Sequence, residues 1–119
     1  MTAYISHLAL GRVSKAEING RDDAIRAAQD AGGVMGGLDV VVKQLKNCKK
    51  NLPVGEQKDM DVIIQSNELV LKQAKALLEL IKAKTSGVGE EAAQEKYDAS
   101  RKECAENISK FGFPLKMLE

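Results

Sequence analysis

The stretch QDAGGVMGGLDVVV, residues 29–42, contains four glycines and decides how many helices the chain forms. Apolar or small residues run through it at steps of three and four, without a change of helical phase. They are Ile25, Ala28, Gly32, Met35, Leu38, Val42 and Leu45. A loop of arbitrary length would not preserve this phase. The spacing therefore predicts one helix over residues 21–50; the alternative is a break at 32–37, with a new helix starting near Leu38.

A row of small residues recurs every four positions in the same segment, at Ala24, Ala28, Gly32 and Gly36. Each glycine inside a helix costs roughly 1 kcal/mol relative to alanine, so close packing should offset that cost. Small side chains let a second backbone approach closely, and the charges of Asp30 and Asp39 rule out a lipid setting. We call this row the small-residue ladder. It predicts close contact with another helix of the chain or with a second copy. The glycine spacing matches neither the P-loop nor the dinucleotide fingerprint.

The strongest helical pattern lies in DMDVIIQSNELVLKQAKALLELIKAKT, residues 59–85. Its inner stripe steps by three and four, with Asn67 filling one gap, through Met60, Ile63, Val70, Ala74, Leu77 and Ile81. Asn67 fits either a buried amide or a side chain turned towards solvent. Turns at Pro53–Gly55 and Gly87–Gly89 flank the segment. A helix over 57–84 follows from this pattern.

Two further helices complete the expected set. The segment 90–111 opens with Glu90 and Glu91, which suit the positive end of a helix dipole. Its inner stripe is Ala93, Tyr97, Ser100, Cys104, Ile108 and Phe111. The first eighteen residues fit a short helix that ends near residue 18, before an Asn19–Gly20 turn.

The architecture follows from the short turns, because short connections make sequential helices antiparallel neighbours. We expect an all-α, up-and-down helical bundle that forms a single domain over residues 1–119. It has three principal helices (21–50, 57–84 and 90–111) and a short N-terminal fourth, so it resembles a four-helix bundle. The first two principal helices would be about 42 Å long and the third about 33 Å.

Composition narrows the classes of function. Eighteen basic residues balance seventeen acidic ones, for a formal net charge of +1, which argues against a nucleic-acid binder. No apolar run is long enough to span a membrane, and the N-terminus lacks a signal-peptide pattern. We expect a soluble chain, cytoplasmic by default, with a mature organellar or exported chain as the alternative. Cys48 and Cys104 lie at different heights of the expected bundle, which predicts two free thiols.

Two groups of residues are candidate contacts with a partner protein. The C-terminal tail, residues 112–119, and the end of the preceding helix bring together Phe111, Phe113, Pro114, Leu115, Met117 and Leu118. An unstructured tail is normally polar, so this one should dock on its own bundle or on a partner. Lys43, Lys46 and Lys50 form the second group. They match the helix dipole and would also suit an acidic partner, but they lack aromatic or arginine neighbours for nucleic acid.

Catalytic patterns are absent from the sequence. Asp22–Asp23 and Glu90–Glu91 sit at expected helix starts, where the helix dipole explains them. His7 is the one histidine, and its place near a glycine only faintly suggests phosphotransfer. We therefore expect no enzyme, no metal and no cofactor.

Three hypotheses follow. The first is a non-catalytic protein–protein interaction module, acting as an adaptor, regulator or accessory subunit of a larger assembly. The second is a self-assembling structural subunit that packs through the small-residue ladder as a homo-oligomer. The third is a small carrier, using phosphotransfer on His7 or holding an apolar ligand.

Overall fold

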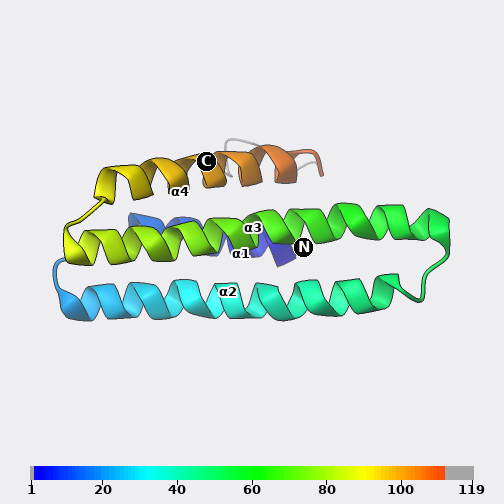
Figure 1. Cartoon of the computed structure of the whole chain (residues 1–119), viewed down its shortest axis with the longest axis horizontal. Coiled ribbons are helices and arrows are strands. Elements are labelled where there is room, and N and C mark those ends of the chain that lie inside the picture. Colours follow the sequence, from blue (N-terminus) through cyan, green and yellow to red (C-terminus); the bar gives the residue numbers. More distant parts are fainter. Residues whose placement is uncertain (1, 112–119) are drawn as a thin grey trace.

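Four α-helices make up the chain in a computed structural model that describes residues 2–111 (Figure 1). They are α1 (Thr2–Lys15), α2 (Arg21–Lys49), α3 (Val54–Ser86) and α4 (Glu90–Ser109). The predicted all-α bundle is confirmed. α2 runs without interruption through the glycines, so the alternative break at residues 32–37 is wrong.

The helix ends follow from local sequence. α3 begins directly after Pro53, where a missing N–H removes no helical hydrogen bond. It ends at Ser86, directly before Gly87, whose φ of 73° is left-handed and whose N–H donates to the Ala83 carbonyl at 2.8 Å. Glycine adopts this conformation without the steric penalty of a Cβ. Acidic pairs occupy the first turns of α2 and α4, as the sequence predicts.

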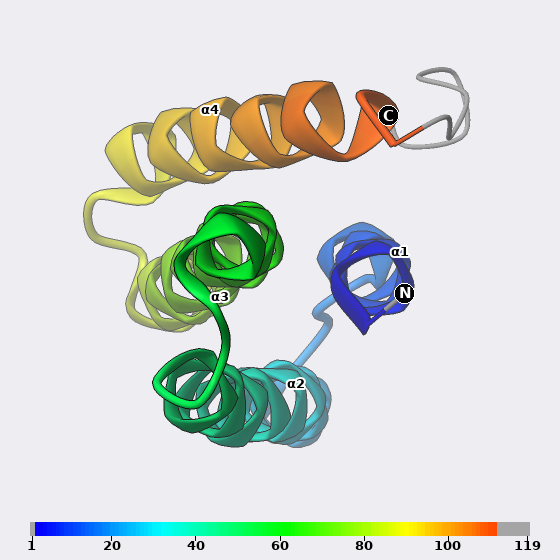
Figure 2. The same ribbon diagram turned by 90° about the vertical axis from the view of Figure 1, so that its right-hand side faces the viewer.

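α3 is the central helix of the bundle. Figure 2 shows α2 and α4 on opposite sides of α3, with α1 beside them, and α3 contacts all three. α1 has 14 residues and α4 has 20, whereas α2 has 29 and α3 has 33. The hairpin that joins α2 to α3 therefore extends beyond the ends of α1 and α4 (Figure 1). We call this end of the molecule the hairpin end.

The buried face of α2 differs from the predicted stripe. Its buried side chains are Ala24, Ala27, Ala31, Leu38 and Val42. Leu38 and Val42 were correctly placed, but Ile25 is 43 % exposed, so the prediction for that residue is wrong. The physical reason is that α2 is covered by both α1 and α3, and their joint position favours the row through Ala27 and Ala31.

The inner stripe of α3 is correct over the covered part of the helix. Val70, Ala74, Leu77 and Ile81 are buried, but Ile63 is 41 % exposed. Asn67 is 2 % exposed, which settles its placement as a buried amide. Its Nδ2 donates to the Ile63 carbonyl at 2.9 Å, and its Oδ1 has no hydrogen-bond partner in the part of the chain that the structure describes.

Candidate functional site

The predicted lysine group lies along the seam between α2 and α3. Lys46 Nζ is 3.5 Å from Glu68 Oε1, and Lys49 Nζ is 2.6 Å from Asp61 Oδ1, so both ion pairs join the two helices. Lys43 pairs instead with Asp39 within α2, at 2.9 Å. Lys50 forms no ion pair with any residue in the range 2–111. Most of the positive charge of this group is therefore matched inside the chain.

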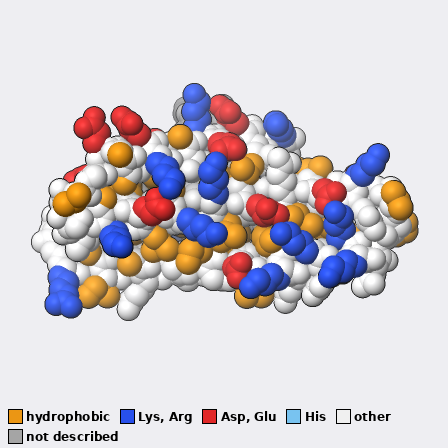
Figure 3. Space-filling view, viewed as in Figure 1, with side chains coloured by type: hydrophobic (Ala, Val, Ile, Leu, Met, Phe, Trp, Pro, Cys, Tyr) orange, Lys and Arg blue, Asp and Glu red, His pale blue; other side chains and the backbone are white. Residues whose placement is uncertain are grey.

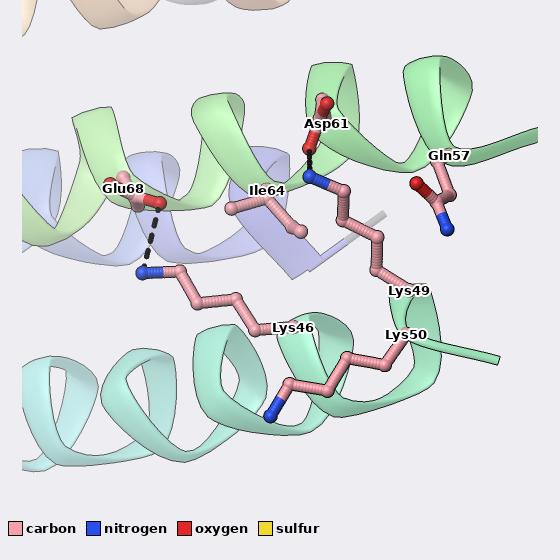
Figure 4. Close-up of a pocket in the computed structure, with 7 residues that line it drawn as sticks. All are labelled: Lys46, Lys49, Lys50, Gln57, Asp61, Ile64 and Glu68. Carbon is pink, nitrogen blue, oxygen red and sulfur yellow. Dashed lines mark ion pairs between the residues drawn. The ribbon is translucent and has the colours of Figure 1, made fainter. Parts of the chain in front are cut away.

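A hollow of about 440 Å³ opens between these lysines, and Figure 4 shows it from the side opposite α1. Ile64, which is buried, lies between the two ion pairs. We call this the distal hollow, because it lies towards the hairpin end. Its lining residues are Lys46, Lys49, Lys50, Gln57, Asp61, Ile64 and Glu68. Three lysines face two carboxylates here, so the charge of the hollow is largely self-compensated.

A second hollow, of about 330 Å³, lies near the other end of the same two helices. We call it the proximal hollow. It is lined by Arg21, Ala24, Ile25, Ala28, Leu78, Ile81, Lys82 and Thr85. Leu78 is two heptads from Ile64, and residues at that spacing share one face of a bundle helix. Hydrophobic side chains flanked by charged ones mark the face shown in Figure 3.

The two alanines and the two glycines of the small-residue ladder have different surroundings. Ala24 is buried and Ala28 is half-buried against the core, and both line the proximal hollow. A Cβ added at Gly32 or Gly36 would meet no atom within 4 Å beyond its own helical surroundings among the described residues. Gly32 and Gly36 therefore make no close contact with another described helix, which contradicts the prediction of close packing within the chain.

A polar chain that the sequence did not reveal crosses the core. His7 is 0 % exposed, and its Nδ1 lies 2.8 Å from Gln73 Oε1. Gln73 Nε2 donates in turn to the Tyr97 hydroxyl at 3.4 Å. An amide oxygen only accepts, so His7 Nδ1 carries the hydrogen. The only sequence signal was a polar residue, Gln73, in a helical segment with a wide apolar face.

Arg101 extends this polar chain towards α1. Its Nη1 donates to the His7 carbonyl at 3.3 Å, and its guanidinium lies over Gly11. A Cβ on Gly11 would come within 2.6 Å of that guanidinium. Three helices are therefore joined by polar contacts in the core. Because His7 is fully buried, a phosphoryl donor has no access to its ring in this structure, which argues against phosphotransfer on His7.

The two cysteines are free thiols, as predicted: Cys48 is exposed and Cys104 is buried. Cys104 Sγ donates to the Leu69 carbonyl at 3.0 Å. Burial raises the pKa of the Cys104 thiol to about 12, with a smaller contribution from Glu103, against the opposing effect of Arg101 and Lys72. A thiol with this pKa is protonated at neutral pH and is a poor nucleophile.

The remaining predicted contacts lie at the C-terminus. Phe111 is exposed just beyond α4, whereas Phe113, Pro114, Leu115, Met117 and Leu118 lie outside the described residues.

Within residues 2–111, no three His, Cys, Asp or Glu side chains gather into a metal-binding group. No helix in that range combines the length and apolar character needed to cross a bilayer. Comparisons of the chain with protein-family models, curated proteins and solved structures find no match.

Proposed function

We propose that the chain is a non-catalytic protein–protein interaction module, acting as an adaptor, regulator or accessory subunit of a larger assembly. The hairpin end is the contact surface that this proposal assigns. The observation that carries it is an apolar row of α3 that continues beyond the helices that cover it.

Ile63, Val70 and Leu77 lie one heptad apart on α3 and share one face. Val70 and Leu77 are 0 % and 1 % exposed, whereas Ile63 is 41 % exposed. Val62, its neighbour in the chain, is also exposed. The same face is therefore buried where other helices cover it and open at the hairpin end. Apolar surface left open in this way is typical of a surface that binds another protein.

Affinity capture from the native source, read by mass spectrometry, tests the proposal. The bait is the full chain, and Ile63→Glu places a charge in the assigned contact surface. We expect this variant to lose specific partners while its helicity by circular dichroism stays unchanged. Val88→Glu is the matched control, because it adds the same charge at an exposed apolar residue between α3 and α4. Equal capture by all three proteins would contradict the proposal.

The C-terminal tail is a second element to test in the same assay. Its apolar residues would contact either the bundle or the partner, and deletion of 112–119 separates these outcomes. Loss of a partner with unchanged helicity would assign the tail to partner binding. Loss of helicity would assign it to the core and remove it as a contact.

A self-assembling subunit is the alternative function, and the open surroundings of Gly32 and Gly36 favour it. Since a Cβ placed at either glycine meets no described atom within 4 Å, a second copy of the chain would have space to approach there. Gly36→Leu should then lower the oligomer mass measured by light scattering, because the added side chain blocks close approach. A mass equal to that of the unaltered chain would remove this alternative.

A further inference from the structure

We propose that the proximal hollow is a docking site for an acidic amphipathic helix of another protein. This goes beyond the proposed function, because it assigns a second surface and states the chemistry of its occupant. Lys82 and Ile63 lie nineteen residues apart on α3, which separates the two surfaces by about 28 Å along the helix.

The wall of the hollow is mainly aliphatic. Ile25 projects at its edge with 43 % of its surface exposed, and Leu78 is half-buried against the core. The Thr85 hydroxyl already donates to the Ile81 carbonyl at 2.8 Å, so its hydrogen is not available to a ligand. A volume of about 330 Å³ is enough for aliphatic anchor side chains. Amphipathic helices bind through such anchors at steps of three and four residues.

Charge determines which helix fits. The proximal hollow is lined by two cations, Arg21 and Lys82, and by no carboxylate. Neither cation forms an ion pair with a residue between positions 2 and 111. The distal hollow differs, because two of its three lysines are paired across the seam. Uncompensated positive charge beside an apolar wall is complementary to an apolar stripe flanked by carboxylates.

The cations also have a spacing that a helix can match. Lys75 lies one heptad before Lys82 on α3, and it too has no ion pair within the described range. The two positions are about 10 Å apart along the axis. Carboxylates seven residues apart on a partner helix would face both. A peptide helix fits better than a flat anionic membrane, because its single anchor side chains can enter the hollow between α2 and α3.

The test uses two synthetic peptide probes and the full chain. The acidic probe has about 18 residues, or about five helical turns, with one leucine stripe flanked by glutamates. In the basic probe every glutamate is replaced by lysine. Fluorescence anisotropy at low salt should show binding of the acidic probe and much weaker binding of the basic one. Higher salt should weaken the acidic complex, because screening reduces attraction between exposed charges.

Variants locate the contact. Lys82→Glu should weaken binding of the acidic probe about tenfold, equivalent to about 1.4 kcal/mol. Lys102→Glu, which changes an exposed lysine of α4, has the same charge change and should leave affinity within about twofold. Ile25→Ser should also weaken binding. Val62→Ser is its matched control, because Val62 is similarly exposed on the far part of α3.

Four results would overturn the inference: no binding of the acidic probe, equal binding of both probes, equal effects of Lys82→Glu and Lys102→Glu, or equal effects of Ile25→Ser and Val62→Ser. A fifth is sedimentation with phosphatidylserine vesicles that depends on Lys82, without peptide binding, since this would assign the hollow to a membrane. Failure of the proposed function would show separately, as partner capture that is insensitive to Ile63→Glu.

Discussion

At the scale of the residue, Gln73 joins two buried polar groups, a hydrogen-bond donor and a hydrogen-bond acceptor. Its oxygen accepts from His7 and its nitrogen donates to Tyr97. Gln73→Leu would leave His7 Nδ1 without this partner in a site closed to water. We expect the free energy of unfolding to fall by about 1–3 kcal/mol, measured by urea denaturation. Tyr97→Phe, which removes only the longer bond, should cost less; equal costs would contradict this account of the polar chain.

Cys104 makes stability depend on pH at the alkaline end. Its pKa is about 12 in the folded chain against an ordinary 9.0, so folding favours the protonated thiol. The resulting stabilisation is complete below pH 9 and is lost as pH rises towards 12. The loss approaches about 1.4 kcal/mol per pH unit for one group. Wild type should therefore lose more stability than Cys104→Ala between pH 9 and 11 in chemical denaturation. Parallel curves would show that burial does not shift this thiol.

Residues involved in long-range contacts were the least predictable. His7 and Gln73 are 66 positions apart, so no local pattern relates them. Cys104 and Tyr97 were placed correctly, because helical phase alone puts both on the inner face of α4. Gly32 and Gly36 of the small-residue ladder show that helical phase alone does not predict which contacts form. Their spacing predicts what could pack there, but only the positions of the other helices show that nothing in the described chain does.

At the scale of the element, the glycines of α2 weaken a helix without a visible packing contact in exchange. A Cβ at Gly36 or Gly37 meets open space among the described residues. Gly36→Ala and Gly37→Ala should each stabilise the chain by about 0.5–1 kcal/mol, seen as a rise of a few degrees in Tm. Gly11→Ala is the contrasting control, because its Cβ would displace the Arg101 guanidinium. It should give no rise, and an equal gain at all three sites would contradict this distinction.

Helix identity and phase were predictable because each element carries enough turns for its pattern to be read. α2 to α4 end within three residues of the expected boundaries. The choice of which face of α2 is buried was less predictable, because it depends on where α1 lies. Ile25 and Ala27 both fit an apolar helix face, and only the combined cover of α1 and α3 selects Ala27.

At the scale of the whole molecule, α3 is packed against more helices at its centre than at the hairpin end, along a longest axis of 51 Å. The centre of α3 contacts three helices, whereas α2 and α3 are the only described helices at the hairpin end (Figure 1). We expect amides near Val62 and Ile63 to exchange hydrogen faster than those near Val70 and Leu77, measured by mass spectrometry. Local opening requires less free energy where fewer apolar contacts must break. Uniform protection along α3 would contradict this gradient, unless an added partner produced it.

The polar chain through His7, Gln73 and Tyr97 also sets how the helices are aligned. Apolar faces alone would tolerate a shift of α1 along α3 by one turn, about 5.4 Å. Such a shift would move His7 from Gln73 to the level of Val70 or Leu77, which offer it no side-chain hydrogen bond. The hydrogen bond of His7 thus fixes the register of α1 relative to α3. Only 3 % of the residues are aromatic, so few large side chains interlock in the core. Buried hydrogen bonds therefore select one helix register among those that apolar packing would allow.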